Sequence, residues 1–164
     1  MCDGKKTCPE ENARARSIAC RILSARPHTE YELAEKLRAR GLNATVVEQI
    51  IFFLKEYGML DDAAFARSYI NQRMQSRPAG KTLLFAELRH RGVPSAIIET
   101  ILEDIDGDTE YDMALRLVMK RKSLSGDCCR PAKIASFLWR RGFSSETIKR
   151  ICKELETAQY PDIS

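Results

Sequence analysis

The chain has 164 residues, is 44% apolar and carries a net charge of +4, so it can bury a core as one domain or as several small repeats. No apolar run approaches the length of a membrane-spanning helix, about 20 residues, and no hydrophobic signal segment follows the N-terminus. These features exclude a membrane protein and predict a soluble, cytoplasmic one. The cysteines are expected to stay reduced, because they show no Cys-x-x-Cys spacing and no accompanying histidine set. They are Cys2, Cys8, Cys20, Cys128, Cys129 and Cys152.

In chain order, we predict a flexible N-terminal extension, three similar units of about fifty residues and a short tail. The predicted ranges are 1–12 for the extension, 13–57, 58–107 and 108–156 for the units, and 157–164 for the tail. A leucine, basic residues and a glycine recur once in each unit, ending at Gly41, Gly92 and Gly142. Basic side chains favour a helix C-terminus, and glycine caps it in the left-handed conformation. Each glycine is therefore predicted to end the second helix of its unit.

A further amphipathic helix is predicted after each glycine turn, beginning at Asn43, Pro94 or Ser144. Its apolar residues have the i, i+3, i+4, i+7 spacing of a helical stripe. They are Val47, Ile50, Ile51 and Leu54 in the first unit, Ile98, Ile101, Leu102 and Ile105 in the second, and Ile148, Ile151, Cys152 and Leu155 in the third. An additional helix precedes the pair each time. There we expect Ala13, Ala64 and Ala114 to hold equivalent positions.

Helix start signals agree with three helices per unit. Thr29 with Glu32, and Thr109 with Asp112, have capping-box spacing, while the acidic pair 61–62 precedes the first helix of the second unit. No segment alternates as a strand does, so we predict an all-α fold of three tandem, helix-turn-helix-like repeats stacked into an elongated molecule. A unit this small buries little alone, and neighbouring units are expected to share core. Residues 52–53, both phenylalanine, are either plain core or an interface between units.

Basic residues concentrate in two stretches. Residues 110–155 hold eleven Lys and Arg against five Asp and Glu, and residues 63–98 hold six against the single acid Glu87. Such clusters indicate a polyanionic partner, either nucleic acid or a filament that contains it, although a solvated helical surface is the alternative interpretation. The candidate partner-binding or nucleic-acid-binding residues are Arg73, Lys81, Arg89, Arg91, Lys133, Arg140 and Arg141.

The second unit contains a more specific segment. Residues 57–66 read Tyr-Gly-Met-Leu-Asp-Asp-Ala-Ala-Phe-Ala, and Gly80, Leu84, Leu88 and the Arg-Gly-Val of residues 91–93 follow. This segment resembles the RecX family, and the resemblance extends over nearly the whole chain. It implies a cytoplasmic, non-enzymatic protein that binds the RecA filament on DNA, lies along its groove and inhibits recombinase and co-protease activities, within homologous recombination, DNA repair and the SOS response. We expect a monomer that binds single-stranded or duplex DNA weakly and without sequence preference.

Several partial motifs do not support catalysis. Residues 79–82, Ala-Gly-Lys-Thr, resemble the end of a phosphate-binding P-loop, but Gln75 stands where its first glycine should be and no strand precedes it. The acidic residues 104–108 suggest a calcium loop, yet Leu115 replaces the bidentate glutamate. His28 and His90 show no arrangement with a nucleophile and a carboxylate. We therefore predict no catalytic residues, no metal site and no cofactor.

A helix-turn-helix transcription regulator is the alternative function, because helix, glycine turn and helix outline such a DNA reader. A recognition helix needs Arg, Asn or Gln on its solvent face. The helix after the first turn offers Thr45, Glu48, Gln49, Lys55 and Glu56, and the helix after the second offers Glu99, Glu103 and Asp104. Phosphates would repel these acids. Only the third, with Lys149, Arg150 and Lys153, suits DNA, and it suits phosphates better than bases. The sequence therefore favours filament binding.

Overall fold

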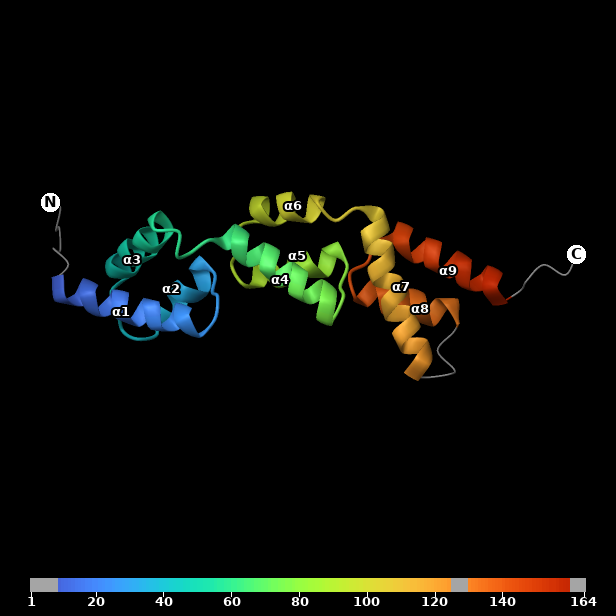
Figure 1. The fold of residues 1–164 in the computed structure, drawn as a ribbon, viewed down its shortest axis with the longest axis horizontal. Helices are drawn as coiled ribbons and strands as arrows, with labels where there is room; N and C mark the ends of the chain where they lie inside the picture. Colours follow the sequence, from blue (N-terminus) through green and yellow to red (C-terminus); the bar gives the residue numbers. More distant parts are fainter. Residues whose placement is uncertain (1–8, 125–129, 160–164) are drawn as a thin grey trace, which may run out of the picture.

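The computed structural model describes residues 9–124 and 130–159, and every regular element in these ranges is an α-helix (Figure 1). The nine helices are α1 Pro9–Ala25, α2 Glu30–Arg38, α3 Ala44–Glu56, α4 Asp62–Ser76, α5 Lys81–His90, α6 Ser95–Glu103, α7 Gly107–Leu124, α8 Pro131–Arg140 and α9 Ser145–Gln159. They form three successive three-helix units, α1–α3, α4–α6 and α7–α9, in an elongated row (Figure 1). The predicted all-α repeat fold is confirmed. Within the described ranges, no helix combines the length and apolar character needed to cross a membrane.

The outer helices extend beyond the predicted units. Helix α1 begins at Pro9, inside the stretch predicted as a flexible extension, because proline suits the first helical position and Glu10 and Glu11 favour the positive end of the helix dipole. Helix α9 continues to Gln159, inside the predicted tail. Cys20 is exposed on α1 and Cys152 is half-buried on α9. The other cysteines, Cys2, Cys8, Cys128 and Cys129, lie outside the described residues.

The glycine turns have the predicted geometry. Gly41, Gly92 and Gly142 have φ angles of +78°, +83° and +77°, the left-handed region that glycine enters without a steric penalty. The Thr29 side chain accepts a hydrogen bond from the backbone N–H of Glu32, as its capping-box spacing predicts. The glycine turns thus mark where the second helix of each unit ends and the third follows, and Thr29 marks where α2 begins.

Two other helix starts need correction or refinement. The predicted start at Thr109 is wrong, because Asp106 Oδ1 accepts from the Thr109 N–H and α7 already begins at Gly107. At α4, Asp61 is the N-cap and its side chain accepts from the backbone N–H groups of Ala63 and Ala64, as expected. Its neighbour Asp62 is buried and accepts from the backbone N–H of Glu30 in the first unit.

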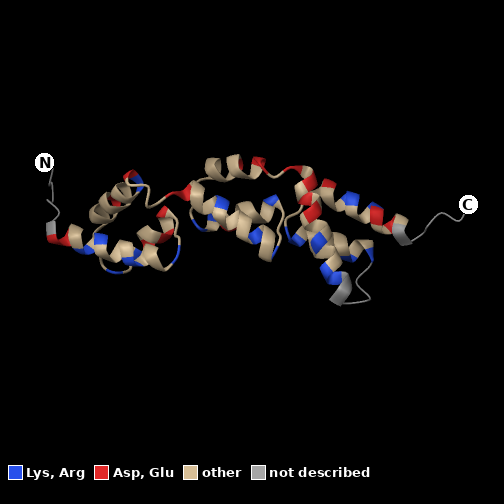
Figure 2. Cartoon of the chain, in the orientation of Figure 1, with Lys and Arg blue, Asp and Glu red and all other residues tan. Residues whose placement is uncertain are grey.

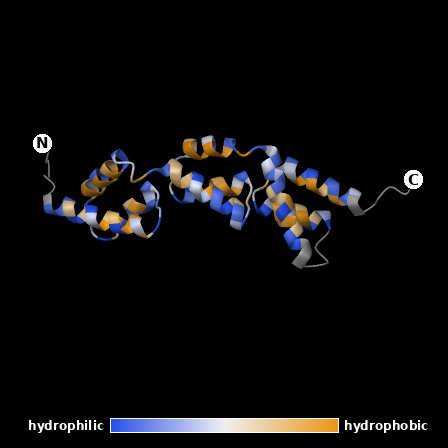
Figure 3. Cartoon of the chain, viewed as in Figure 1, coloured by the Kyte–Doolittle hydropathy of each residue, from blue (hydrophilic) through white to orange (hydrophobic). Residues whose placement is uncertain are grey.

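The predicted apolar stripes line the cores of the units. Every stripe position is buried except Ile51 and Cys152, which are half-buried at the margin, and α3 and α6 are visibly apolar (Figure 3). The register predicted for the first helices is wrong in two units, because Ala13 and Ala64 are exposed. Their places in the core are taken two residues later, by Ala15 and Ala66. The sequence between the first and second helices is two residues longer in the third unit, which displaced the alignment.

The apolar core is divided in two. One buried cluster belongs to the first unit alone, from Ala15 to Leu60, while a second runs continuously through the other two units, from Ala66 to Leu155. Core sharing is therefore confirmed between the second and third units and wrong between the first and second. Neither interpretation of residues 52–53 is confirmed, because Phe52 is 65% exposed and Phe53 lies at the core edge beneath the guanidinium of Arg16.

Successive units meet in one repeated arrangement. The N-terminus of the second helix in one unit abuts the glycine turn that ends the second helix of the next unit. Thr29 Oγ1, before α2, donates to the carbonyl oxygen of Arg91 over 2.6 Å, and the N–H of Gly80, before α5, donates to the carbonyl oxygen of Arg141 over 2.9 Å. The positive end of one helix dipole thus faces the negative end of another, which is favourable. The second helices consequently follow one another along the long axis of the molecule (Figure 1).

Candidate polyanion-binding cleft

A cleft of about 730 Å³ lies between the second and third units. The C-terminal end of α4 and the start of α5 form one side, and α7 with α8 forms the other. Six of its lining residues are basic and no described acidic residue lines it. The basic residues are Arg73, Arg77, Lys120, Arg121, Arg140 and Arg141. In the view of Figure 2, basic segments gather on the lower part of α7 and α8, whereas the linkers α3–α4 and α6–α7 on the upper edge are acidic.

Glu87 orients one wall of the cleft. Arg73 Nη2 lies 2.6 Å and Nε lies 2.9 Å from the two carboxylate oxygens of Glu87, and Tyr69 donates its hydroxyl to the same carboxylate. The hydrogen bond to Glu87 raises the pKa of Arg73, so this guanidinium stays charged. Because its guanidinium is already bound to Glu87, Arg73 mainly forms part of the cleft wall. The other basic residues of the cleft carry more of the positive charge that a ligand can contact.

Phe137 supports the opposite wall from α8. The guanidinium of Arg121, from α7, lies 4.6 Å from the centre of its ring, and that of Arg141 lies 5.4 Å away. Cations over an aromatic face are attracted by the electron-rich ring. One aromatic ring thus holds guanidinium groups from α7 and from the end of α8 at the cleft, where each can pair with an anion.

The cleft brings together three of the seven predicted binding residues, Arg73, Arg140 and Arg141. The other four lie elsewhere. Lys81 lies in a shallow groove beside Glu99 and Glu103. Arg89 is exposed at the end of α5, Lys133 is exposed on the first turn of α8, and Arg91 lies at the junction with the first unit. Their binding role stays a prediction.

Three cleft residues were missing from the predicted set, Arg77, Lys120 and Arg121. All belong to the two basic stretches that the sequence identifies. Periodicity did not select them because a basic stretch on a helix has several exposed faces. Only the packing of α7 against the second unit decides which face joins the cleft.

The motifs that resembled catalytic sites have structural roles. The N–H groups of Gly80 and Thr82, which a phosphate at the start of α5 would need, already donate to the carbonyl oxygens of Arg141 and Gly142. Asp106 is a helix cap. Residues 9–124 and 130–159 contain no group of three or more His, Cys, Asp or Glu side chains that could hold a metal ion.

Helix α9, the one candidate recognition helix, is partly engaged within its own unit. Arg150 lies 2.8 Å from Asp108 Oδ1, contacts Glu154 at 3.8 Å, and covers the ring of Tyr111 at 3.9 Å from its centre. A guanidinium held by two carboxylates and a ring is poorly placed to contact a base edge. The geometry of α9 therefore gives no support to operator recognition.

The fold and the cleft define the class of protein: an all-α tandem-repeat protein with an extended, cation-lined surface. Comparison with known proteins identifies the family. Residues 15–54 match the model of "RecX, first three-helix domain" and residues 61–102 match "RecX, second three-helix domain". The chain belongs to the RecX family.

Individual relatives agree. "Regulatory protein RecX" of Mycobacterium sp. (strain KMS) is 36% identical over 143 residues, which are 83% of this chain and 78% of the relative. The protein of the same name from Chlorobium limicola is 33% identical, over 86% and 89%. The crystal structure of RecX from Lactobacillus salivarius has the same fold, with a TM-score of 0.81 at 24% identity, over 91% of this chain and 99% of that one.

Proposed function

We propose that this protein is a non-catalytic, cytoplasmic regulator that binds the nucleoprotein filament of a RecA-type recombinase as a monomer and inhibits its recombinase and co-protease activities. Membership of the RecX family, whose curated relatives are named regulatory proteins, supports the class of function. The observation that carries the partner is the cleft, where six basic side chains converge from two units.

An elongated molecule is suited to such a partner. A filament that contains DNA presents a long, repetitive polyanionic surface, and a row of three units can contact it at several points. Each contact is weak, but contacts made within one bound molecule add strongly because the later ones are intramolecular. Direct binding to free DNA, single-stranded or duplex, is then weak, independent of sequence and steeply dependent on salt.

The decisive experiment titrates the purified protein into RecA ATPase and strand-exchange reactions on single-stranded DNA. We expect inhibition at or below equimolar protein. The double variant Arg77→Gln with Arg140→Gln removes one exposed cation from each wall of the cleft, and we expect it to need several-fold more protein for half-inhibition. The matched control, Arg67→Gln with Arg116→Gln, removes the same charge from exposed positions outside the cleft.

Three outcomes contradict the proposal. If the native protein leaves both reactions unchanged, RecA is not its partner. If the cleft variant and the control lose inhibition equally, the cleft is not the contact surface. A marked preference for one duplex sequence that persists at high salt indicates a transcription regulator instead.

A further inference from the structure

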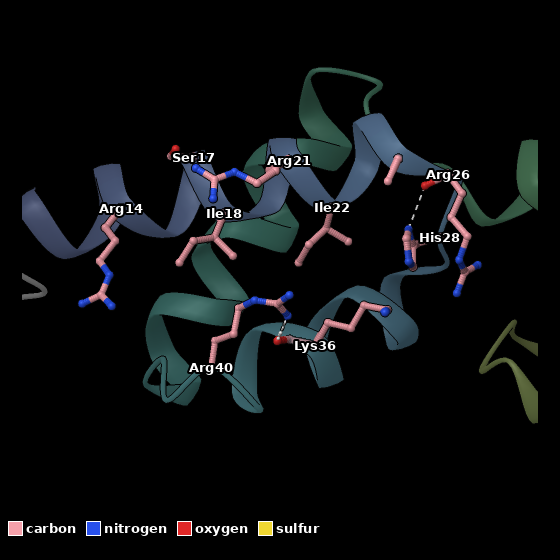
Figure 4. Close-up of a pocket in the computed structure, with 10 residues that line it drawn as sticks. Arg14, Ser17, Ile18, Arg21, Ile22, Arg26, His28, Lys36 and Arg40 are labelled. Carbon is pink, nitrogen blue, oxygen red and sulfur yellow. Dashed lines mark hydrogen bonds between the residues drawn. The ribbon is translucent and has the colours of Figure 1, made fainter.

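A second cationic recess lies in the first unit, away from the cleft. It is a groove of about 860 Å³ between α1 and α2 (Figure 4). We call it the α1–α2 groove. Its lining residues are Arg14, Ser17, Ile18, Arg21, Ile22, Ala25, Arg26, His28, Lys36 and Arg40. Charge counting does not reveal it, because residues 1–109 contain equal numbers of acids and bases.

The cations of the groove are largely uncompensated. Of its five basic residues, only Arg26 makes an ion pair, at 3.2 Å from Glu32. No carboxylate in the described part of the chain pairs with the other four, and no described acid lines the groove. Like charges held around one recess repel each other, and an anion that enters it relieves this repulsion.

The groove also contains an unsatisfied polar group. His28 is 5% exposed, its Nδ1 lies 2.8 Å from the carbonyl oxygen of Arg26, and its Nε2 is buried without a hydrogen-bond partner (Figure 4). Because Nδ1 lies beside a carbonyl oxygen it carries the ring proton, so Nε2 can donate to the oxygen of an anion only when the ring is charged. Burial lowers the pKa of His28, and an anion in the groove would raise it. The four cations without a carboxylate partner point to an anionic ligand, and His28 lies where it can report its arrival.

The arrangement of the cations favours a linear polyanion. Arg14 and Arg21 project from α1 two helical turns apart, about 10 Å along the axis, while Lys36 lies on α2 and Arg40 in the turn that follows it. The groove is therefore longer than one phosphate or carboxylate group. Figure 4 shows these side chains bordering the groove from both helices, with Ile18 and Ile22 between them.

The floor of the groove argues against a protein helix as ligand. An amphipathic helix gains its affinity by inserting apolar side chains into an apolar groove. Here Ile22 is 9% exposed and Ile18 is only half-buried, so the floor offers little apolar surface to cover. Attraction to charge is the main source of binding energy that remains, and a phosphodiester backbone supplies it at regular spacing.

We propose that the α1–α2 groove binds the phosphate backbone of a nucleic-acid strand. The inference rests on the proposed function only in taking nucleic acid as the polyanion, and it adds a contact site in the first unit. With the cleft between the second and third units, the protein then holds an extended strand at two separated points. Binding at the second point is intramolecular, which raises the overall affinity without new contacts at either site.

The first test is the salt dependence of binding to a fluorescent oligo(dT), followed by anisotropy with the full chain. Each phosphate contact on a single strand contributes about 0.7 to the slope of log affinity against log salt. We expect Arg21→Gln with Lys36→Gln to lower that slope by about 1.4. The control Arg67→Gln with Arg116→Gln, at exposed positions outside both recesses, is expected to leave it unchanged. Equal slopes for the two variants overturn the proposal, provided circular dichroism shows both to be folded.

The second test follows the His28 ring by nuclear magnetic resonance while oligo(dT) is added. The chain has two histidines, so the ring signals are few and assignable with His28→Asn and His90→Asn. We expect the His28 signals to shift in the native protein and to stay in place in the Arg21→Gln, Lys36→Gln variant. Binding of oligo(dT) to the native protein without a change at His28 means that the groove stays empty, and the proposal is wrong.

The RecA assay separates this inference from the proposed function. A groove variant that binds oligo(dT) normally but no longer inhibits RecA indicates that the groove holds an acidic protein surface, which overturns the inference and keeps the function. A native protein that binds oligo(dT) through the groove but does not inhibit RecA gives the opposite result. The inference then stands and the proposed function fails.

Discussion

The two junctions of this molecule share one register but differ in chemistry. Side chains join the first unit to the second: Arg91 lies 2.6 Å from Glu32 and above the ring of Tyr69, and Asp62 accepts from the N–H of Glu30. Backbone atoms join the second unit to the third, through the hydrogen bonds of residues 80 and 82 to the turn at 141–142 and through one continuous core. The same repeat thus produces a detachable unit and a fused pair.

One position contributes to this difference. The residue that precedes the second helix is Thr29 in the first unit and Gly80 in the second. The threonine side chain keeps the backbones apart and makes the hydrogen bond itself, whereas the glycine lets two backbones touch. We therefore expect the second and third units to unfold together, and the first to separate from them more easily.

The largest effect is expected at the fused junction. A Cβ added at Gly80 would lie 2.2 Å from the carbonyl oxygen of Gly142 and 2.4 Å from the Cα of Phe143, both backbone atoms that cannot rotate away. Gly80→Ala should therefore destabilise the fused pair by about 3 kcal/mol, as forced overpacking does. Urea denaturation measures the loss. Gly107→Ala is the control, because no atom lies within 4 Å of its added Cβ. If Gly80→Ala and Gly107→Ala are equally stable, the two backbones at this junction can move apart at little cost, and the prediction is wrong.

An intermediate effect is expected at the side-chain junction. Arg91→Gln removes the ion pair with Glu32 and the cation over Tyr69, so docking of the first unit should weaken by about 2 kcal/mol, a usual value for a charged hydrogen bond. Hydrogen exchange resolved along the chain should show faster exchange in α1–α3 and little change in α7–α9. Arg89→Gln, at an exposed position nearby, should change neither the docking of the first unit nor the exchange in α1–α3. Faster exchange throughout the molecule would mean that all three units unfold as one.

The smallest effect is expected in the pH dependence of the free energy of unfolding. Burial opposes ionisation of Glu87, but hydrogen bonds from Arg73 and Tyr69 outweigh it and lower the pKa of this carboxyl. Its contribution to stability is therefore complete above the ordinary pKa, near 4.5, and is lost as pH falls through the lowered pKa. Glu87→Gln should cost about 1 kcal/mol at pH 7 and progressively less below pH 4.5.

Asp62 at the first junction should respond in the opposite sense. Burial raises the pKa of Asp62, so its contribution to stability is greatest at low pH and declines as pH rises through the raised pKa. Urea midpoints at several pH values check the Glu87 prediction, with Glu103→Gln, on an exposed carboxylate of α6, as the control. A Glu87→Gln deficit that stays constant down to pH 3 contradicts the assigned role of the ionised carboxylate.

The sequence alone determined the repeat, the glycine turns, the N-caps Thr29 and Asp61, and the buried stripes. These features depend on local rules: glycine enters the left-handed region freely, and an i, i+3, i+4, i+7 pattern fixes the apolar face of a helix whatever surrounds it. The glycine turns and Thr29 accordingly lie where predicted. The resemblance carried by the second unit also identified the family, because it consists of core and cap residues that are specific in combination.

Only the tertiary structure decided how helix faces meet. Ala13 and Ala64 were aligned with Ala114 by their distance from the glycine of each unit, and this gave the wrong register. The number of residues between two helices does not show which turn of the first helix packs into the core. Charge counting over residues 1–109 concealed the α1–α2 groove, since the acids that balance it lie on other surfaces. The cleft between the units draws cations from α4, α7 and α8. Contacts of that kind depend on three-dimensional packing between distant segments, which no local periodicity specifies.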